Sequence, residues 1–196
     1  MKREQKEWMQ SWCDETNNGD LPRVLLVGDS ITRGYQERVR KRLEGICYVD
    51  YLSMSYAIDQ PIYSRVLKAF VETSKYDIIH FNHGLHGIHV PKRTYKSGVK
   101  KLLLKIACEK KLILATSTIV YHSNTKRKYG AWMKRVKERN AAVYELAKEF
   151  NCAVDDLYTT STKIPFESRS SDGFHYATIG YEMLADSVAE SIKNVL

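Results

Sequence analysis

The sequence has no long hydrophobic run and no apolar N-terminal leader. None of its apolar stretches approaches the ~20 residues that a membrane-spanning helix needs, so we expect no membrane span. The chain begins Met-Lys-Arg-Glu-Gln-Lys-Glu, which lacks the apolar core of a secretory signal. We therefore expect either a cytoplasmic protein or one whose leader is missing from this chain.

Cysteines are few and scattered. Cys13, Cys47, Cys108 and Cys152 form no Cys-x-x-Cys pair and no dense framework. Cys47 and Cys152 fall in expected strands, and Cys108 falls late in an expected helix. We therefore expect buried, reduced thiols rather than disulfides.

Acidic residues are in the minority. The chain has 23 of them against 31 Lys and Arg, which gives a formal net charge of +8. The basic residues are spread along expected helices without an RNA-binding motif or an aromatic stacking pattern, so we expect no nucleic-acid partner. The favoured interpretation is solvated helix faces. The alternatives are attraction of an anionic substrate, such as an acidic sugar, and a nucleic-acid-binding module driven by charge.

Short β-rich runs alternate with longer helical patterns throughout the chain. A length of 196 residues, with 43% hydrophobic residues, suits one domain with one core. The expected strands are 23–28, 46–52, 76–82, 111–117 and 152–157. The expected helices are 31–43, 61–73, 91–109, 129–150 and 178–195.

This alternation predicts an α/β fold, a three-layer α/β/α sandwich around a central five-stranded parallel sheet. Two expected strands, Val-Leu-Leu-Val at 24–27 and Leu-Ile-Leu-Ala at 112–115, are continuously apolar, as befits strands covered on both faces. Residues 1–20 are expected to form a lead-in helix and a turn. A single domain then spans residues 21–196.

Three separated blocks hold the parts of a hydrolytic site. They are Val-Gly-Asp-Ser-Ile-Thr at 27–32, Phe-Asn-His-Gly at 81–84 and Asp-Gly-Phe-His at 172–175. They offer a hydroxyl, an amide and a histidine with a nearby carboxylate, which are the groups that ester cleavage requires. Ser30 follows the first expected strand and Asn82 ends the third, so both belong to the edge where parallel sheets place their sites.

Each of these residues also has a purely structural interpretation. Ser30 suits the N-cap of a helix, and Asn82 suits a turn with Gly84. Asp172 and His175 could be an ordinary loop aspartate and a surface histidine. The presence of all three blocks together favours chemistry over these alternatives.

The blocks resemble the SGNH/GDSL hydrolase family, in the family's order and from about Val24 to Val188. The resemblance implies a flavodoxin-like sandwich in which Ser30 is the nucleophile and His175, oriented by Asp172, is the base. It also implies that the backbone N–H of Ser30 and the side chain of Asn82 form the oxyanion hole. No metal and no organic cofactor are required.

The chain departs from the commonest family pattern in two places. His80-Phe81-Asn82-His83 stands where the family has Gly-x-Asn-Asp, and the stretch 82–87, Asn-His-Gly-Leu-His-Gly, resembles a carbohydrate-esterase-like branch. The family's oxyanion glycine after the second strand is also absent. We expect the backbone N–H of Ser55, or of a neighbour, to replace it.

Histidines recur at 80, 83, 86 and 89, which suggests a metal site. Gly84 and Gly87 argue against one helix that presents them together, and no cysteine or acidic cluster completes a ligand set within the run. We therefore predict no metal. Asp29, His83, His86 and Tyr121 are instead predicted to contact substrate, with a solvent loop as the alternative for Tyr121.

The prediction is a serine hydrolase that cleaves an ester through an acyl-Ser30 intermediate and removes short acyl groups, acetyl above all, from a carbohydrate. The expected partner is a small-molecule or carbohydrate ester. A lipid or thioester hydrolase on the same fold and a non-catalytic carbohydrate-binding domain are the alternatives. The sequence carries no indication of the oligomeric state.

Overall fold

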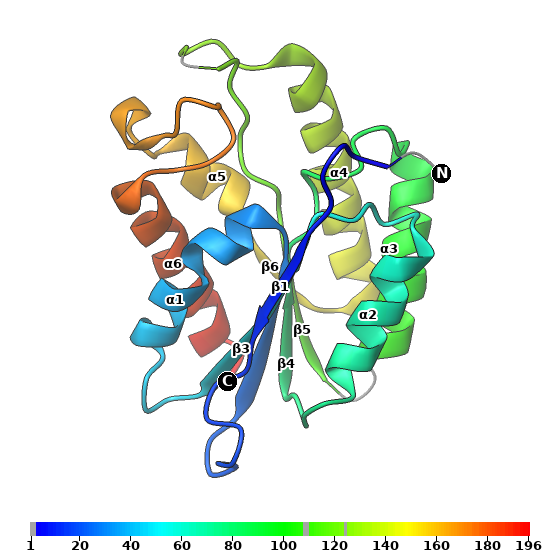
Figure 1. The fold of residues 1–196 in the computed structure, drawn as a ribbon, viewed down its shortest axis with the longest axis vertical. Coiled ribbons are helices and arrows are strands. Elements are labelled where there is room, and N and C mark those ends of the chain that lie inside the picture. The colour runs from blue at the N-terminus through cyan, green and yellow to red at the C-terminus, as the bar shows by residue number, and fades with distance from the viewer. Residues whose placement is uncertain (1–2, 108–109, 124) are drawn as a thin grey trace.

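A six-stranded sheet lies between two layers of helices (Figure 1) in the computed structural model, which describes residues 3–107, 110–123 and 125–196. The strands are β1 (Met9–Trp12), β2 (Arg23–Gly28), β3 (Tyr48–Met54), β4 (Ile78–Phe81), β5 (Lys111–Ala115) and β6 (Ala153–Asp155). Their order across the sheet is β1-β3-β2-β4-β5-β6.

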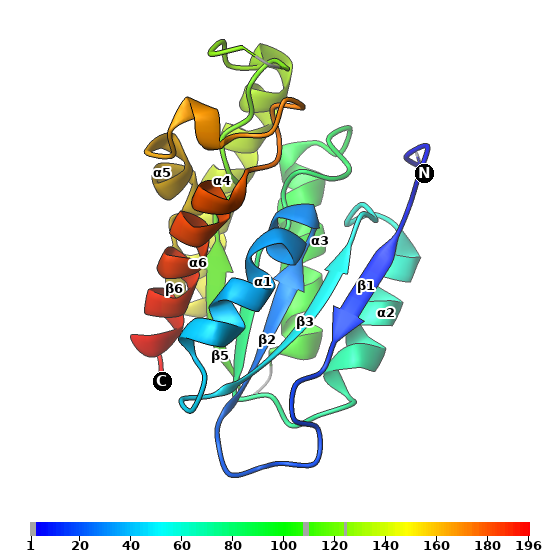
Figure 2. The same ribbon diagram turned by 60° about the vertical axis from the view of Figure 1, so that its left-hand side comes forward.

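Five of the strands, β2 to β6, run parallel, whereas β1 pairs antiparallel with β3 at one edge (Figure 2). The carboxyl ends of the parallel strands therefore meet at one end of the sheet, which is the upper end in Figure 1. The loops that follow β2 and β4 and the loop that precedes α6 gather there. The five-stranded parallel sheet expected from the sequence is confirmed.

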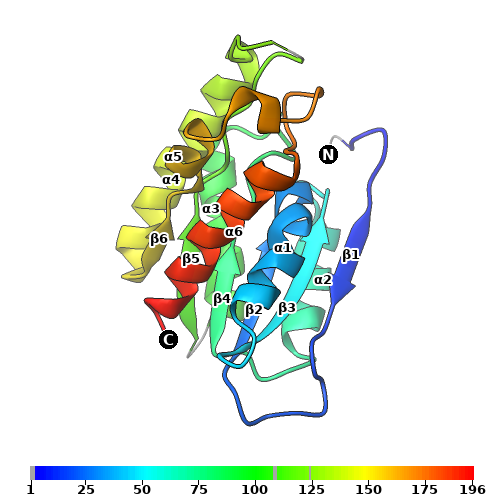
Figure 3. The same cartoon turned by 90° about the vertical axis from the view of Figure 1, so that its left-hand side faces the viewer.

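Helices cover both faces of the sheet. One layer contains α1, α5 and α6, and the other contains α2, α3 and α4 (Figure 1, Figure 3). The helices are α1 (Ser30–Arg42), α2 (Pro61–Val71), α3 (Lys92–Ile106), α4 (Gly130–Phe150), α5 (Leu157–Thr162) and α6 (Thr178–Lys193), with a 3-10 turn at Phe166–Ser168.

Strand β2 lies in the middle of the sheet and is covered by helices on both faces. Every one of its residues is buried, and the side chains alternate between the two layers. Val24 and Leu26 join the core beneath α1 and α6, whereas Leu25 and Val27 join the core beneath α2 and α3. A strand with two dry faces must be apolar throughout, and this explains the run Val-Leu-Leu-Val.

The N-terminal segment differs from the expectation. The lead-in helix predicted within residues 1–20 is wrong, because Met9–Trp12 forms the edge strand β1. A short isolated helix gains little free energy in water, whereas pairing with Tyr51–Met54 satisfies the outer backbone groups of β3. The short helix α5 was not predicted either.

Among the described residues, no helix combines the length and apolar character of a membrane span. Cys47 and Cys152 lie immediately before β3 and β6 rather than inside them, and both are unpaired. Cys108 and the expected end of the helix at residue 109 fall outside the described residues.

Candidate active site

Ser30, His175 and Asp172 form one hydrogen-bonded chain at the carboxyl end of the sheet. The Oγ of Ser30 lies 2.7 Å from Nε2 of His175, and Nδ1 of the same ring lies 2.6 Å from Oδ2 of Asp172. The three residues come from the start of α1 and from the loop before α6, almost at opposite ends of the sequence. Tertiary structure thus brings a hydroxyl, an imidazole and a carboxylate within hydrogen-bond reach, which is the arrangement that nucleophilic catalysis requires.

The join between β2 and α1 fixes Ser30. Asp29 is 1% exposed, and its carboxylate accepts a hydrogen bond from the N–H of Ile31 at 3.0 Å, so Asp29 is the N-cap of α1. Ser30 is therefore the first helical residue, and its hydroxyl is not used as a cap. A Cβ at Gly28 would come within 1.9 Å of the Thr32 hydroxyl oxygen, so only glycine permits this turn.

The loop before α6 fixes Asp172 and His175. The Oδ1 of Asp172 accepts hydrogen bonds from the N–H groups of Phe174 and His175, at 2.8 and 3.0 Å. Partial burial tends to raise the pKa of Asp172, but these bonds and the one from the His175 ring outweigh it and lower the pKa. Asp172 is therefore a carboxylate that can stabilise a protonated His175.

Gly173 keeps this loop close to Tyr121. Its φ is +82°, and a Cβ there would stand 2.1 Å from the carbonyl oxygen of Tyr121. The N–H of Tyr121 donates to the carbonyl of Gly173 at 3.0 Å. Tyr121 thus supports the loop that carries the acid and the base, and it does so through its backbone.

Asn82 offers an amide with unused hydrogen-bonding capacity. Its backbone N–H donates to the carbonyl of Val27 at 2.8 Å, which places Asn82 beside the end of β2. The residue is 2% exposed, and among the described residues its Nδ2 makes no hydrogen bond of normal geometry, the hydroxyl of Tyr35 being its polar neighbour. A buried amide donor without an acceptor is costly unless a ligand supplies one.

A cavity of about 490 Å³ opens over Ser30 and His175. Its lining combines apolar and aromatic residues (Leu85, Ile88, Trp132 and Phe174) with polar residues (Arg3, Glu4, Gln5, His86 and His89). The rings of Trp132 and Phe174 meet edge to face with 4.8 Å between their centroids. The volume lies within the range of small-molecule sites, about 300–1,000 Å³.

Of the four residues predicted to contact substrate, the structure brings only His86 to the cavity. Asp29 is occupied as the cap of α1 and also accepts the N–H of Leu85 at 3.4 Å. Tyr121 lines a different, smaller hollow beside the ring-stacked guanidinium of Arg169. The substrate contacts predicted for Asp29 and Tyr121 are therefore wrong in this structure.

His83 also differs from the prediction, because it is buried in the core. Its ring packs against Tyr63 and Tyr95, and Nε2 bonds to the carbonyl of Tyr56 at 3.1 Å. Burial, with the nearby positive charge of Arg139, lowers the pKa of His83 to about 4. A neutral, enclosed imidazole contacts its aromatic neighbours and not the cavity.

Ser55 does not supply the missing oxyanion donor. Its N–H donates to the carbonyl of Trp8 at 3.1 Å, and its Oγ accepts the N–H of Trp8 at 2.8 Å. The sequence could not anticipate this, because it did not indicate that residues near Trp8 pair beside the end of β3. The prediction for Ser55 is wrong for that reason.

The four histidines of the run 80–89 point to four separate partners. His80 bonds to Asp155 at 2.9 Å, His86 to Glu4 at 2.8 Å, and His89 approaches Asp59 at 3.4 Å, while His83 is enclosed as described. Among the described residues, no three His, Cys, Asp or Glu side chains cluster as a metal site would require.

Sequence reasoning missed the aromatic pair and the N-terminal wall of the cavity. Phe174 had a signal, since it lies inside the Asp-x-x-His block. Trp132 lies at the start of the helix after the fourth expected strand, which also belongs to this edge. No signal in the sequence indicated that Arg3, Glu4 and Gln5 line the cavity, because a lead-in helix was expected at this end of the chain.

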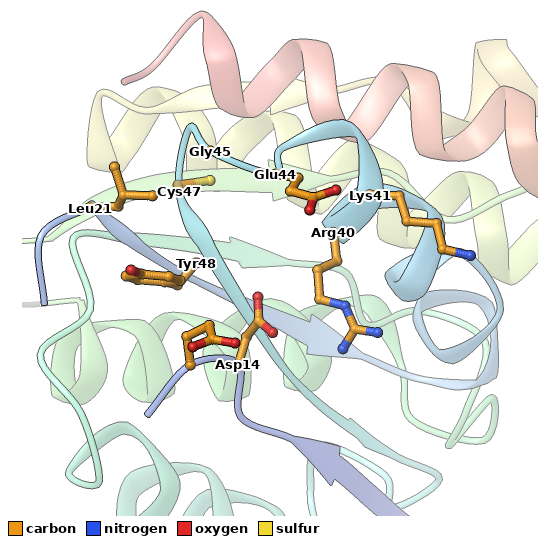
Figure 4. A pocket seen from close by; sticks show the side chains of 9 residues that line it. Asp14, Leu21, Arg40, Lys41, Glu44, Gly45, Cys47 and Tyr48 are labelled. Atoms are coloured by element: carbon orange, nitrogen blue, oxygen red, sulfur yellow. The ribbon is translucent and has the colours of Figure 1, made fainter. Parts of the chain in front are cut away.

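A second hollow, of about 230 Å³, lies at the opposite end of the sheet (Figure 4). Arg40, Glu44, Cys47 and Tyr48 are among its lining residues. Burial raises the pKa of Cys47 to about 11, so its thiol is not activated at neutral pH. This hollow carries both signs of charge, and the hydroxyl of Tyr48 in its lining donates to the carboxylate of Asp20 at 2.5 Å.

No protein-family model matches this chain, and a comparison with curated proteins finds no match. Solved structures do match. A lipase/acylhydrolase from Enterococcus faecalis has a TM-score of 0.71 at 21% identity, covering 89% of this chain and 96% of that one. A GDSL-like lipase from Bacteroides thetaiotaomicron has a TM-score of 0.69 at 17% identity, with 89% of both chains covered. An acetylxylan esterase from Geobacillus stearothermophilus has a TM-score of 0.72 at 16% identity, covering 87% and 94%.

At these identities the likeness establishes the fold. The chain has the three-layer architecture of GDSL-type lipases and esterases along almost its whole length. The SGNH-type fold expected from the sequence is confirmed. The activity of this chain has to be argued from its own site.

Proposed function

We propose that this protein is a serine hydrolase that cleaves carboxylic esters through an acyl-Ser30 intermediate. The observation that carries the proposal is the hydrogen-bonded chain from Ser30 through His175 to Asp172 at the mouth of a cavity. A serine hydroxyl is a weak nucleophile until a base removes its proton, and here the base is in contact with it. The esterases and lipases that share the fold support the same chemistry.

The reaction has two steps in this proposal. Nε2 of His175 takes the proton of Ser30 as Oγ attacks the ester carbonyl, and Asp172 stabilises the imidazolium. The developing oxyanion accepts hydrogen bonds from Nδ2 of Asn82 and from the backbone N–H of Ser30 at the start of α1. His175 then protonates the leaving alcohol, and a water molecule activated by His175 hydrolyses the acyl-Ser30 ester.

The proposed substrate is a short acyl ester, acetyl above all, of a carbohydrate. Two observations support it. The stretch 82–87 resembles a carbohydrate-esterase-like branch of the family, and one matching structure is an acetylxylan esterase. The apolar residues Leu85 and Ile88 in the cavity lining favour a second candidate, a hydrolase of longer acyl chains, on the same site.

The test is hydrolysis of p-nitrophenyl acetate by the wild type and Ser30→Ala, with Ser64→Ala on α2 as the matched control. We expect turnover in the wild type and the control, and loss of turnover in Ser30→Ala. Equal, feeble rates in all three proteins would contradict the mechanism and favour a carbohydrate-binding domain. A series of p-nitrophenyl esters from acetate to decanoate then separates the two substrate candidates, because a deacetylase loses activity as the chain lengthens.

A further inference from the structure

The N-terminal arm, residues 3–8, forms one wall of the proposed active site. Arg3, Glu4 and Gln5 line the same cavity as Ser30 and His175. In Figure 1 the arm rises from β1 toward the loop between β4 and α3. Nothing in the proposed mechanism uses these side chains, which leaves their presence in the cavity to be explained.

Four contacts hold the arm in place. Trp8 exchanges hydrogen bonds with Ser55, and its ring lies under the guanidinium of Arg33, 4.5 Å from the ring centroid. The carboxylate of Glu7 accepts a hydrogen bond from the side chain of Gln60 at 2.8 Å. Because Ser55, Arg33 and Gln60 belong to the folded domain, these contacts hold the side chains of the arm at a fixed position.

Within the arm, the carboxylate of Glu4 contacts the loop between β4 and α3 that lines the cavity. Oε2 is 2.8 Å from Nδ1 of His86, and Oε1 accepts the N–H of Gly87 at 3.2 Å. A carboxylate has about four lone-pair sites, so about two remain for further donors. The side chain is 36% exposed, which leaves these sites accessible from the cavity.

Aromatic surface in the same cavity complements this acceptor. Trp132 and Phe174 contribute aromatic rings to the lining, and the arm contributes a carboxylate and a guanidinium. A sugar ring has an apolar face of C–H groups and an edge of hydroxyl groups, so it can pack on an aromatic ring and donate hydrogen bonds to a carboxylate. An alkyl alcohol has no further hydroxyl groups to donate to that carboxylate.

We propose that Glu4 binds the hydroxyl groups of the alcohol half of the ester and so selects polyhydroxylated alcohols, such as sugars, over alkyl and aryl alcohols. The inference rests on the proposed function and adds a specificity residue that lies outside the three family blocks. A hydrogen bond from a hydroxyl to a carboxylate is charge-assisted. Its loss should therefore reduce selectivity for the sugar ester by about 10- to 100-fold.

The kinetic test compares an acetylated methyl xyloside with p-nitrophenyl acetate in the wild type, Glu4→Gln and Glu4→Ala. We expect the ratio of kcat/KM for the sugar ester to kcat/KM for the aryl ester to fall by about 10- to 100-fold, mainly through KM. Glu37→Gln on the exposed face of α1 is the matched control and should leave the ratio unchanged. Equal losses on both esters, or no change on either, would overturn the proposal.

A binding measurement separates this inference from the proposed function. NMR titration of methyl xyloside into Ser30→Ala, which cannot form the acyl-enzyme, should give binding that weakens by at least about tenfold in Ser30→Ala/Glu4→Gln. Unchanged binding in the double variant, or no binding in Ser30→Ala, would overturn the role of Glu4 even if Ser30 hydrolyses esters. Failure of the proposed function shows instead as turnover that does not depend on Ser30.

Discussion

Asn82 combines nearly complete burial with an amide nitrogen that makes no hydrogen bond of normal geometry among the described residues. Such a group costs stability in the resting protein unless it serves a transient acceptor. We expect Asn82→Ala to lower kcat for p-nitrophenyl acetate by about 10²–10³ and to change KM little. Thermal unfolding should change little, because the substitution removes no partnered side-chain donor.

The matched control is Asn194→Ala, at the exposed C-terminal end of α6. It should leave both kcat and the unfolding midpoint unchanged. Retention of full kcat in Asn82→Ala would show that Asn82 is not part of the oxyanion hole. Its role would then be structural.

Arg139 supports the loop that follows Asn82. Its buried guanidinium donates to the carbonyls of Gly84 and His86 at 2.7 Å each, and also to the carbonyl of Gly87. Its charge lies 4.8 Å from the centroid of the Tyr95 ring. These partners are neutral, so the guanidinium acts as a positioning residue for the loop between β4 and α3.

We expect Arg139→Met to lower the free energy of unfolding by about 2–4 kcal/mol, because the carbonyls of Gly84, His86 and Gly87 all lose the guanidinium donor. Urea denaturation measures this directly. Arg135→Met on the same helix is the control, since Arg135 is half-buried and forms its ion pair with Glu138 one turn along α4. We expect a change below about 0.5 kcal/mol. A similar, small loss in both variants would contradict the role assigned to Arg139.

At the scale of elements, the N-terminal arm and the loop between β4 and α3 are coupled through the pair Glu4–His86. Burial lowers the pKa of His86, but the hydrogen bond and charge of Glu4 outweigh it, with help from Asp29, and the pKa is raised above 6.5. Burial raises the pKa of Glu4, but the contacts with His86 and Gly87 lower it below 4.5. Both side chains are therefore charged when the pH lies between the lowered pKa of Glu4 and the raised pKa of His86.

The sign of the pH dependence follows from these directions. The contribution of His86 is fully present below pH 6.5 and is lost as pH rises through its raised pKa. The contribution of Glu4 is present above pH 4.5 and is lost as pH falls through its lowered pKa. We therefore expect the arm to dock most firmly between about pH 4.5 and 6.5.

NMR titration of the His86 ring checks this coupling. In Glu4→Gln the pKa of His86 should fall relative to the wild type, because burial remains and the carboxylate is gone. Glu37→Gln should leave it unchanged. An unchanged His86 titration in Glu4→Gln would show that the arm does not hold the position described here.

At the scale of the whole molecule, the net charge of +8 creates a positive field. Such a field accelerates the encounter with an anion and is screened by salt. If the natural ester is an acidic sugar, kcat/KM for an acetylated glucuronic acid should fall several-fold between about 0.01 and 1 M salt, where the Debye length shrinks from about 30 to 3 Å. The neutral methyl xyloside ester is the control and should respond far less.

Equal salt responses for the charged and neutral esters would show that the basic residues do not attract the substrate. They would then be charges on solvated helix faces. Several of them already make surface ion pairs. Lys92 and Lys96 pair with Glu145, and Lys100 pairs with Glu149, between α3 and α4. Pairs of this kind use positive charge locally and weaken the field.

The sequence by itself determined the features that depend on local pattern. Continuous apolar runs predicted the buried strands, and the helical spacing after Gly28 placed Ser30 at a strand-to-helix turn. Because parallel strands share one carboxyl edge, the alternation of elements also indicated which motifs could meet. The fold and the placement of Ser30 and Asn82 at one edge follow from these rules, whereas the pairing of Ser30 with His175 and Asp172 was implied by the family resemblance.

Only the tertiary structure decided which groups near that edge are free. Trp8 occupies the N–H of Ser55, aromatic rings enclose His83, and Asp29 caps α1. It also placed Glu4 against His86, a contact between residues 82 positions apart. The pairing of β1 with β3 depends on an open sheet edge that no local pattern encodes. Short segments such as β1 take their structure from the partner they meet, so the wall they build could not be read from their own residues.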